Sequence, residues 1–262
     1  LFISRFHLEP AQDADVGSNT LRTYALNKNE YFVLHVKNDK DGTKVPEIVL
    51  QKALDREKQS IHHLILTGID GGDPVRSGNA QITIKVLDAN DNAPVFEQDL
   101  YEIKVVENSA PGTIIQMVKA IDLDDGVNSE IEYSLGSLTQ EAIKQLFSID
   151  SDTGELTISK RNIDNESTKS YRFDFSAKDK GNPELMGHSS VHINIIDEND
   201  NSPEIILTSS PSPVPENASV RTVVALINVK DLDFDANGKV NVNISPGIME
   251  NRSSPPQSQW IY

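Results

Sequence analysis

The chain has 262 residues, no cysteine and a formal net charge of −16 at pH 7, with 37% hydrophobic and 24% charged residues. This composition is typical of folded protein and excludes disulfide frameworks, thiolate zinc sites and a cysteine nucleophile. A surface of this charge repels nucleic acid, so we expect no nucleic-acid partner. No apolar run approaches the roughly 20 residues that a membrane helix needs.

Short stretches with an apolar residue at every second position predict half-buried antiparallel strands. In chain order they are 81–88, 101–107, 131–135, 156–159, 171–179 and 191–197. Between them, 140–147 (QEAIKQLF) predicts a short helix of one or two turns. We expect the following apolar residues to face the core: Ile103, Val105, Ile131, Tyr133, Leu135, Phe147, Ile149, Leu156, Ile158, Phe173, Phe175, Val191, Ile193 and Ile195.

Acidic motifs recur along the chain at one fixed spacing. The motif D-x-N-D-N-x-P occupies 88–94 and again 197–203, and we call the offset from position 88 to position 197 the repeat period. The same offset relates D-x-D at 13–15, 122–124 and 231–233, and D-x-E at 55–57 and 164–166. A period of this length corresponds to a whole domain, because the repeating unit of a solenoid is much shorter. We predict three repeats, 1–92 without its start, 93–201 complete and 202–262 without its end, and about seven short strands per repeat predict β-sandwiches.

Asp70 and Asp179, and Glu107 and Glu216, are related by the same offset, and with them these motifs hold 18 of the 40 acidic residues, so the acidity is concentrated. Carboxylate and amide oxygens without histidine or cysteine favour a hard cation, calcium before magnesium. The stretch DLDFDANG (231–238) begins like an EF-hand loop, but Ala236 takes the place of the required glycine and Val242 that of the bidentate glutamate. The sites must therefore be assembled from segments that are distant in the sequence.

With D-x-N-D-N-A-P, L-D-R-E, D-x-D-x-G-x-N, V-E-N and A-K-D-x-G-x-P in place, the chain resembles a cadherin ectodomain. The stretches NEYFVL (29–34) and QLFSIDSDTGEL (145–156) are similar to the clustered protocadherins. The resemblance implies an all-β fold of tandem seven-stranded Greek-key β-sandwich repeats joined by calcium-binding linkers. On that analogy they are the second, third and part of the fourth extracellular repeat.

The resemblance also implies a set of calcium ligands at each junction between repeats. For the first junction the side chains are Asp55, Glu57, Asp88, Asn90, Asp91, Asp122, Asp124 and Asp179, with carbonyls of Ala89, Asn92 and Asn128. For the second they are Glu107, Asp164, Glu166, Asp197, Asn199, Asp200, Asp231 and Asp233, with carbonyls of Glu198, Asn201 and Asn237. A further junction upstream is indicated by Asp13, Asp15 and Asp70, with Asn19 as a carbonyl donor.

The function that the resemblance implies is calcium-dependent, homophilic cell–cell adhesion. The partner is the same or a closely related protocadherin on an apposed cell, and a segment outside this chain anchors the protein, so that these repeats lie on the extracellular side of the cell membrane. By register with Ile131, Tyr133 and Leu135, we expect Arg22, Tyr24 and Leu26 to face the core. Leu21, Thr23 and Ala25 then face outward as a candidate recognition face.

Two other classes of function compete with adhesion. A calcium-stiffened spacer without self-recognition would have the same motifs, and only a test of self-association separates it from an adhesion protein. An enzyme is not expected, because the chain has no glycine-rich phosphate loop and no G-x-S-x-G nucleophile elbow, and fully coordinated carboxylates are poor proton shuttles.

Two features depart from the repeat pattern. Asp235 stands where the other repeats have Gly17 and Gly126, so we expect a slightly distorted loop, and the strand pattern is lost after about Pro246. Four N-x-[ST] sequons occur, at Asn165, Asn217, Asn243 and Asn251. Since Asn165 and Asn217 adjoin acidic motifs, we expect Asn243 and Asn251 to be the acceptors.

Overall fold

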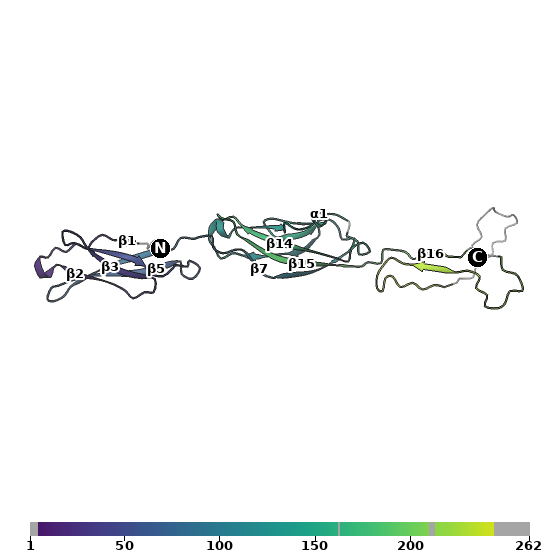
Figure 1. Cartoon of the computed structure of the whole chain (residues 1–262), viewed down its shortest axis with the longest axis horizontal. Helices are drawn as coiled ribbons and strands as arrows, with labels where there is room; N and C mark the ends of the chain where they lie inside the picture. Colours follow the sequence, from purple (N-terminus) through teal and green to yellow (C-terminus); the bar gives the residue numbers. More distant parts are fainter. Residues whose placement is uncertain (1–4, 162, 210–212, 244–262) are drawn as a thin grey trace. The chain divides into compact units, whose positions relative to one another are not determined.

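A computed structural model describes residues 5–161, 163–209 and 213–243. The described chain forms two compact units, one built from residues up to Val95 with 120–132 and 177–187, and one from 96–119, 133–176 and the described part of 188–262. Strands dominate throughout (Figure 1), which confirms the all-β fold class. Among the described residues, no helix combines the length and apolar character that a membrane span requires.

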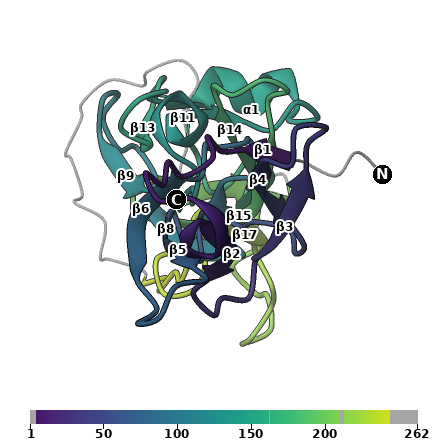
Figure 2. The same cartoon turned by 90° about the vertical axis from the view of Figure 1, so that its left-hand side faces the viewer.

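The first repeat contains two antiparallel three-stranded sheets, whose strands are labelled in Figure 2. One sheet has the order β1 (Arg5–His7), β4 (Lys44–Leu50), β3 (Phe32–Asn38). The other has the order β2 (Leu21–Leu26), β5 (Ile61–Asp70), β6 (Ser77–Lys85). Phe32, Ile48 and Leu64 form the buried cluster of this repeat, which places its core on the apolar faces of these alternating strands.

The middle repeat contains a four-stranded, a three-stranded and a two-stranded sheet. The four-stranded sheet has the order β11 (Ile131–Leu135), β14 (Ser170–Asp179), β15 (Met186–Ile196), β8 (Leu100–Val106). The three-stranded sheet has the order β12 (Phe147–Ile149), β13 (Glu155–Ile158), β9 (Ile114–Met117). In the two-stranded sheet, β10 (Ala120–Ile121) pairs with β7 (Val95–Phe96). Strand β8 runs parallel to β15, so the expectation of antiparallel pairing is wrong for 101–107. A two-residue period shows only which residues share a face, and it carries no information on strand direction.

The predicted core of the middle repeat is largely confirmed. Eleven of its fourteen predicted inward residues are buried, and Ile131, Leu135 and Ile149 are half-buried. The predicted helix is α1 (Glu141–Leu146), whose Ile143 is buried. Aromatic rings fill the interior, with Phe175 in contact with Tyr101 at a centroid distance of 5.7 Å.

The register expected for β2 is wrong at its first two residues. Tyr24 is buried and Leu26 half-buried, but Arg22 is exposed. The ladder between β2 and β5 shifts between Leu21 and Thr23. A bulge of this kind inserts one residue and interrupts the alternation. Leu21 is accordingly half-buried rather than outward-facing, whereas Thr23 and Ala25 are exposed.

In the third repeat, β16 (Glu204–Leu207) pairs antiparallel with β17 (Ile227–Lys230). Gly17 and Gly126 adopt φ values of 69° and 60°, and Asp235 adopts 51° at the corresponding place. The loop therefore keeps its left-handed residue despite the substitution, a conformation that aspartate tolerates better than most residues. The chain after Pro246, including Asn251, lies outside the described residues, and Asn243 and Asn217 are both exposed.

Candidate metal sites

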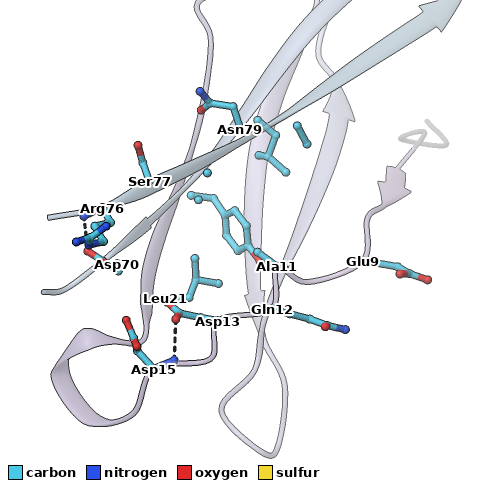
Figure 3. Close-up of a pocket in the computed structure, with 15 residues that line it drawn as sticks. Glu9, Ala11, Gln12, Asp13, Asp15, Leu21, Asp70, Arg76, Ser77 and Asn79 are labelled. Atoms are coloured by element: carbon cyan, nitrogen blue, oxygen red, sulfur yellow. Dashed lines mark hydrogen bonds between the residues drawn. The ribbon is translucent and has the colours of Figure 1, made fainter.

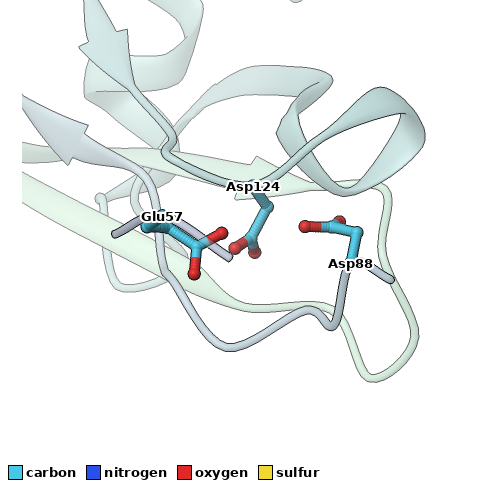
Figure 4. A group of neighbouring side chains, drawn as sticks. All are labelled: Glu57, Asp88 and Asp124. Carbon is cyan, nitrogen blue, oxygen red and sulfur yellow. The ribbon is translucent and has the colours of Figure 1, made fainter. Parts of the chain in front are cut away.

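The first acidic cluster joins three loops. Glu57 lies in the turn between β4 and β5, Asp88 follows β6, and Asp124 precedes the 3₁₀ helix Gly126–Ser129. One ligand atom from each lies within 4.8 Å of the others. Figure 4 shows these three carboxylates directed toward a common space. Segments far apart in the sequence thus supply one oxygen-rich site, as the distant motifs predicted.

Amide donors hold these carboxylates in place. Asp88 accepts hydrogen bonds from the backbone N–H of Asp125 (3.1 Å) and from Nδ2 of Asn128 (2.8 Å). Asp124 accepts two from Asn92, through its backbone N–H (3.2 Å) and its Nδ2 (2.8 Å). Burial raises the pKa of Asp88, but these donors and Arg56 outweigh it and hold the pKa below its ordinary value. Asp88 is therefore ionised at neutral pH.

A second set of acids adjoins this cluster. Asp179 is fully buried and accepts hydrogen bonds from the backbone N–H groups of Gly181 (2.9 Å) and Leu185 (3.1 Å), and from Nδ2 of Asn90 (3.0 Å). The pKa of Asp122 is raised by burial and by repulsion from Asp124, Asp179 and Asp88. Crowded carboxylates that repel one another in this way are stabilised by a cation.

Sequence reasoning missed Arg56, the residue between Asp55 and Glu57. Its guanidinium forms ion pairs with Asp88 and with Glu57, the latter at 2.7 Å, and donates to the carbonyl of Leu123 at 2.8 Å. Its side chain is only 18% exposed. The protein thus places one of its own cations beside the first acidic cluster.

The second cluster repeats this frame one repeat period later. Asp233 accepts from Asn201 through its backbone N–H (3.1 Å) and its Nδ2 (2.8 Å). Asp197 accepts from Asn237 Nδ2 (2.9 Å) and from the backbone N–H of Phe234 (3.2 Å). Two groups of acids meet here, and they share a member: Glu107, Asp164 and Glu166, then Glu166, Asp200 and Asp233.

Glu107 organises the second cluster from within. It is 1% exposed and accepts hydrogen bonds from the backbone N–H groups of Asn165 (2.7 Å) and Glu198 (2.6 Å). Asn165 takes the place that Arg56 has in the first cluster, and its buried Nδ2 donates to the carbonyl of Ile195 at 2.8 Å. Asn108, which sequence reasoning also missed, donates to Asp200 at 2.6 Å.

Glu166 has the most strongly shifted pKa in this cluster. Its hydrogen bond with Asp164, its burial and the charges of Glu107 and Asp164 raise the pKa of Glu166 to about 8. The same hydrogen bond lowers the pKa of Asp164. Without a metal ion, the pair therefore holds one proton at neutral pH.

Some predicted ligands lie outside these groups. Asp55 pairs with Lys58 at 2.6 Å instead of joining Glu57, Asp91 accepts from Asn92, and Asn199 is exposed. Asp13 and Asp15 occupy the loop before η1 (Gly17–Asn19), with the Asp15 N–H donating to Asp13 at 3.0 Å. Together with Asp70 they border the cavity drawn in Figure 3.

Unpartnered buried oxygen atoms show independently that the residues of the two clusters suit a hard cation. Within the described ranges, Asn90 Oδ1, Asp122 Oδ2, Glu166 Oε1 and Asp233 Oδ2 are buried and have no hydrogen-bond partner. All four are oxygen acceptors of residues in the repeated motifs. Buried acceptors of this kind carry a desolvation cost unless a donor or a cation satisfies them, so the residues present suit an oxygen-ligated metal ion.

Comparison with known proteins identifies the fold. The family profile described as the cadherin domain matches residues 5–87 and 101–196. The chain belongs to the cadherin family. This confirms the resemblance given by its motifs, and the family is one of adhesion proteins rather than enzymes.

Its relatives are clustered protocadherins. The chain is 51% identical to human (Homo sapiens) protocadherin gamma-C3 over 94% of its length and 47% identical to chimpanzee (Pan troglodytes) protocadherin alpha-10 over 95%. It spans about a quarter (26%) of each of these relatives. Among solved structures, the protocadherin gamma-B4 extracellular domain matches with a TM-score of 0.85 and 42% identity, covering 94% of this chain and 38% of that one. Protocadherin gamma-B2 extracellular cadherin domains 1–5 match with a TM-score of 0.82 and 44% identity, covering 90% and 44%.

Proposed function

We propose that this chain is part of an extracellular protein of calcium-dependent, homophilic cell–cell adhesion. The observation that carries the proposal is the pair of acidic clusters built on one hydrogen-bond frame and separated by one repeat period, each with buried oxygens that lack donors. Cadherin membership and the protocadherin relatives supply the adhesive role. Repeats 1–92, 93–201 and 202–262 are the proposed modules.

Calcium is the proposed ion at both clusters. At the first, Glu57, Asp88, Asp91, Asp122, Asp124 and Asp179 would hold it with Asp55, Asn90 and the carbonyls of Ala89, Asn92 and Asn128. At the second, the holders would be Glu107, Asp164, Glu166, Asp197, Asn199, Asp200, Asp231 and Asp233 with the carbonyls of Glu198, Asn201 and Asn237. Asp13, Asp15 and Asp70, with the Asn19 carbonyl, would belong to a third site. The ion supplies the positive charge that offsets the repulsion between these carboxylates.

The proposed partner is the same or a closely related protocadherin on an apposed cell. The proposed location is the extracellular side of the cell membrane, with the anchor outside this chain. Thr23 and Ala25, exposed on β2, are the outward positions proposed for recognition, and half-buried Leu21 contributes less. A spacer without self-recognition is the competing function, and it predicts the same metal sites without self-association.

Calcium titration tests the metal sites. Isothermal calorimetry on the chain should detect several ions with dissociation constants in the range of about 10⁻⁴–10⁻³ M. Asp124→Asn should remove binding at the first cluster and Asp233→Asn at the second, whereas Glu102→Gln, an exposed acid outside the motifs, should change nothing. Equal binding by all four proteins would refute the assignment.

Aggregation of coated beads tests adhesion. Beads that carry the ectodomain containing this chain should aggregate in millimolar calcium and disperse when a chelator is added. Replacing Thr23 and Ala25 together by glutamate should weaken aggregation while calorimetry shows unchanged calcium binding. Calcium binding without aggregation of the unaltered ectodomain would favour the spacer.

A further inference from the structure

The sequence contains a single Asn-Gly pair, Asn237-Gly238, which lies in the loop after the D-x-D motif of the third repeat. The corresponding residues of the first and middle repeats are Asn-Thr at 19–20 and Asn-Ser at 128–129. The backbone nitrogen of a residue can attack the side-chain amide of an asparagine that precedes it, and a glycine has no β-carbon to obstruct this attack. The third-repeat loop thus differs from its two counterparts in the reactivity of its asparagine.

The backbone of the loop requires a glycine at position 238. A Cβ atom added to Gly238 would lie 2.2 Å from the carbonyl oxygen of Asp233 and 3.0 Å from its carbonyl carbon. In the other two repeats, where the loop forms a 3₁₀ helix, the same place is held by Thr20 and Ser129, which carry a β-carbon. The third repeat therefore cannot exchange its glycine for a protecting residue without moving Asp233, a member of the second cluster.

The side chains of Asn237 and Asn128 have matching surroundings. Nδ2 of Asn237 donates to Asp197 at 2.9 Å, and Nδ2 of Asn128 donates to Asp88 at 2.8 Å. Both side chains are half-buried. The side-chain hydrogen bond therefore does not distinguish the two asparagines, and the residue that follows each of them does.

The attacking nitrogen in the third repeat is only weakly held. The backbone N–H of Gly238 donates to the carbonyl of Phe234 at 3.3 Å, which is longer than a typical N–H···O hydrogen bond. Little hydrogen-bond energy is therefore lost when this nitrogen turns toward the side chain of Asn237.

We propose that Asn237 is a site of spontaneous deamidation, through which the second cluster loses the amide that holds Asp197. The nitrogen of Gly238 gives up its proton and bonds to Cγ of Asn237, the bond from Cγ to Nδ2 breaks, and the leaving nitrogen takes up a proton and departs as ammonia. Water then opens the cyclic imide at either of its two carbonyls. Opening at the side-chain carbonyl gives aspartate, and opening at the main-chain carbonyl gives isoaspartate, in which the main chain runs through the β-carbon.

Either product removes the donor that Asp197 has in Nδ2 of Asn237. Aspartate at position 237 places a second carboxylate against Asp197, and the two repel each other. Isoaspartate also lengthens the main chain just before Gly238, where the carbonyl of Asp233 leaves no room. The loop 231–238 thereby loses its side-chain hydrogen bond to the linker. The consequence for calcium rests on the function proposed above, whereas the chemical change does not.

Ageing of the whole chain in calcium-free buffer tests the chemical step. Peptide mass spectrometry should show that Asn237 is converted at least about tenfold faster than Asn128, because the β-carbon of Ser129 raises the barrier to attack. The rate should rise with the hydroxide concentration, since the attacking nitrogen must lose its proton. Methylation by an isoaspartate methyltransferase identifies the isoaspartate. Equal rates at Asn237 and Asn128 would overturn the proposal.

Two variants of Ser129 test the cause of the difference. Ser129→Gly creates a second Asn-Gly pair in the middle repeat and should accelerate deamidation of Asn128 at least about tenfold. Ser129→Ala removes the same hydroxyl and keeps the β-carbon, so Asn128 should react as it does in the unaltered chain. A rate at Asn128 that is the same in both variants would refute the argument from the following residue.

Hydrogen exchange and calorimetry on the aged chain test the consequence. Protection of 231–238 should fall in calcium-free buffer, and protection of the corresponding loop 122–129 should not. Unchanged protection after conversion of Asn237 would refute the loss of anchoring. Calcium affinity should fall at the second cluster alone, and deamidation with lost protection but unaltered calcium binding would count against the calcium assignment instead of the deamidation site.

Discussion

The two acidic clusters share a hydrogen-bond frame and differ at its centre. The residue between the two acids of D-x-E is Arg56 in the first cluster and Asn165 in the second. Arg56 brings a cation to Asp88 and Glu57. Asn165 brings none: its backbone N–H donates to buried Glu107 at 2.7 Å and its Nδ2 to the carbonyl of Ile195 at 2.8 Å.

The two clusters therefore stabilise their neighbouring carboxylates in two different ways. An internal guanidinium offsets part of the repulsion before any metal ion binds, and it must also be displaced or accommodated when one does. A carboxylate held by backbone donors is fixed in position, but the net charge around it stays negative. We therefore expect the first cluster to lose less order on calcium removal and the second to bind calcium more tightly.

The largest effect is expected from Glu107→Ala. The change leaves two backbone N–H groups, those of Asn165 and Glu198, without their acceptor, at a cost of roughly 2–4 kcal/mol in the local free energy of opening. Native-state hydrogen exchange in calcium-free buffer, followed in peptides that cover Asn165 and Glu198, measures this quantity. Glu102 is exposed on neighbouring β8, and Glu102→Ala should leave the local free energy of opening unchanged. Equal effects of the two changes would show that Glu107 does not stabilise the second cluster.

The pH dependence of calcium binding should follow Glu166. Because the pKa of Glu166 in the metal-free fold is raised from 4.5 to about 8, the folded chain holds a proton between these values that the unfolded chain has lost. The contribution of this proton to stability is complete below pH 4.5 and is lost as the pH rises through about 8. Calcium needs the ionised carboxylate, so affinity at the second cluster should rise up to about tenfold per pH unit below pH 8.

Calorimetry in buffers of different ionisation enthalpy measures the proton released with calcium. At pH 7 the unaltered chain should release close to one proton in total as calcium fills the second cluster. Glu166→Gln should abolish the release, whereas the exposed variant Glu102→Gln should retain it. A release that is the same in all three proteins would contradict the shifted pKa.

A smaller effect should follow from exchanging the central residues of the clusters. Arg56→Asn should raise calcium affinity at the first cluster about fivefold, because calcium no longer competes with a partly buried cation. In chelator, the same change should reduce protection of the 88–92 loop toward that of the 197–201 loop. Terbium luminescence and hydrogen exchange report the two quantities. Arg172→Asn, which changes an exposed arginine on β14, is the control. If Arg56→Asn changes neither calcium affinity nor hydrogen-exchange protection at the first cluster, Arg56 does not cause the difference between the clusters.

The smallest effect concerns the loop after the D-x-D motif. Asp235 has φ of 51° where Gly126 has 60°. Asp235→Gly should therefore stabilise the loop of the third repeat by about 1 kcal/mol or less. Gly126→Asp should destabilise the corresponding loop of the middle repeat by a similar amount. Hydrogen exchange in the two loops gives both values, and changes of the same sign at the two positions would show that φ does not control them.

The sequence predicted the parts of this molecule that depend on periodicity. Alternation located the strands and most of the buried residues of the middle repeat, since a strand that faces a core on one side must alternate. It failed at Arg22, because a bulge between Leu21 and Thr23 interrupts the ladder and no residue in that stretch signals it. It also failed for the direction of β8, which depends on tertiary pairing.

The motif spacing predicted which acids would meet, and it overlooked the residues that position them. Glu57, Asp88 and Asp124 lie together as expected, as do Glu166 and Asp233 with Asp200. Arg56 was missed because arginine does not recur there at the repeat period, Asn108 because only the glutamate beside it was taken as a ligand, and Asn165 because it was considered only as a sequon. Their places beside repeated acids could have singled them out. Asp55 departs from its counterpart Asp164 because Lys58 pairs with it, whereas the uncharged Ser167 stands at the corresponding place beside Asp164.

The buried amide of Asn165 has a consequence for the biosynthesis of the protein. Asn165 opens a sequon, and a glycan is attached through Nδ2, the atom that donates to the carbonyl of Ile195 inside the fold. A glycan on this atom would prevent that bond and would not fit beside the buried side chain. A chain that carries a glycan at Asn165 is therefore expected to lack this hydrogen bond and the local packing around it.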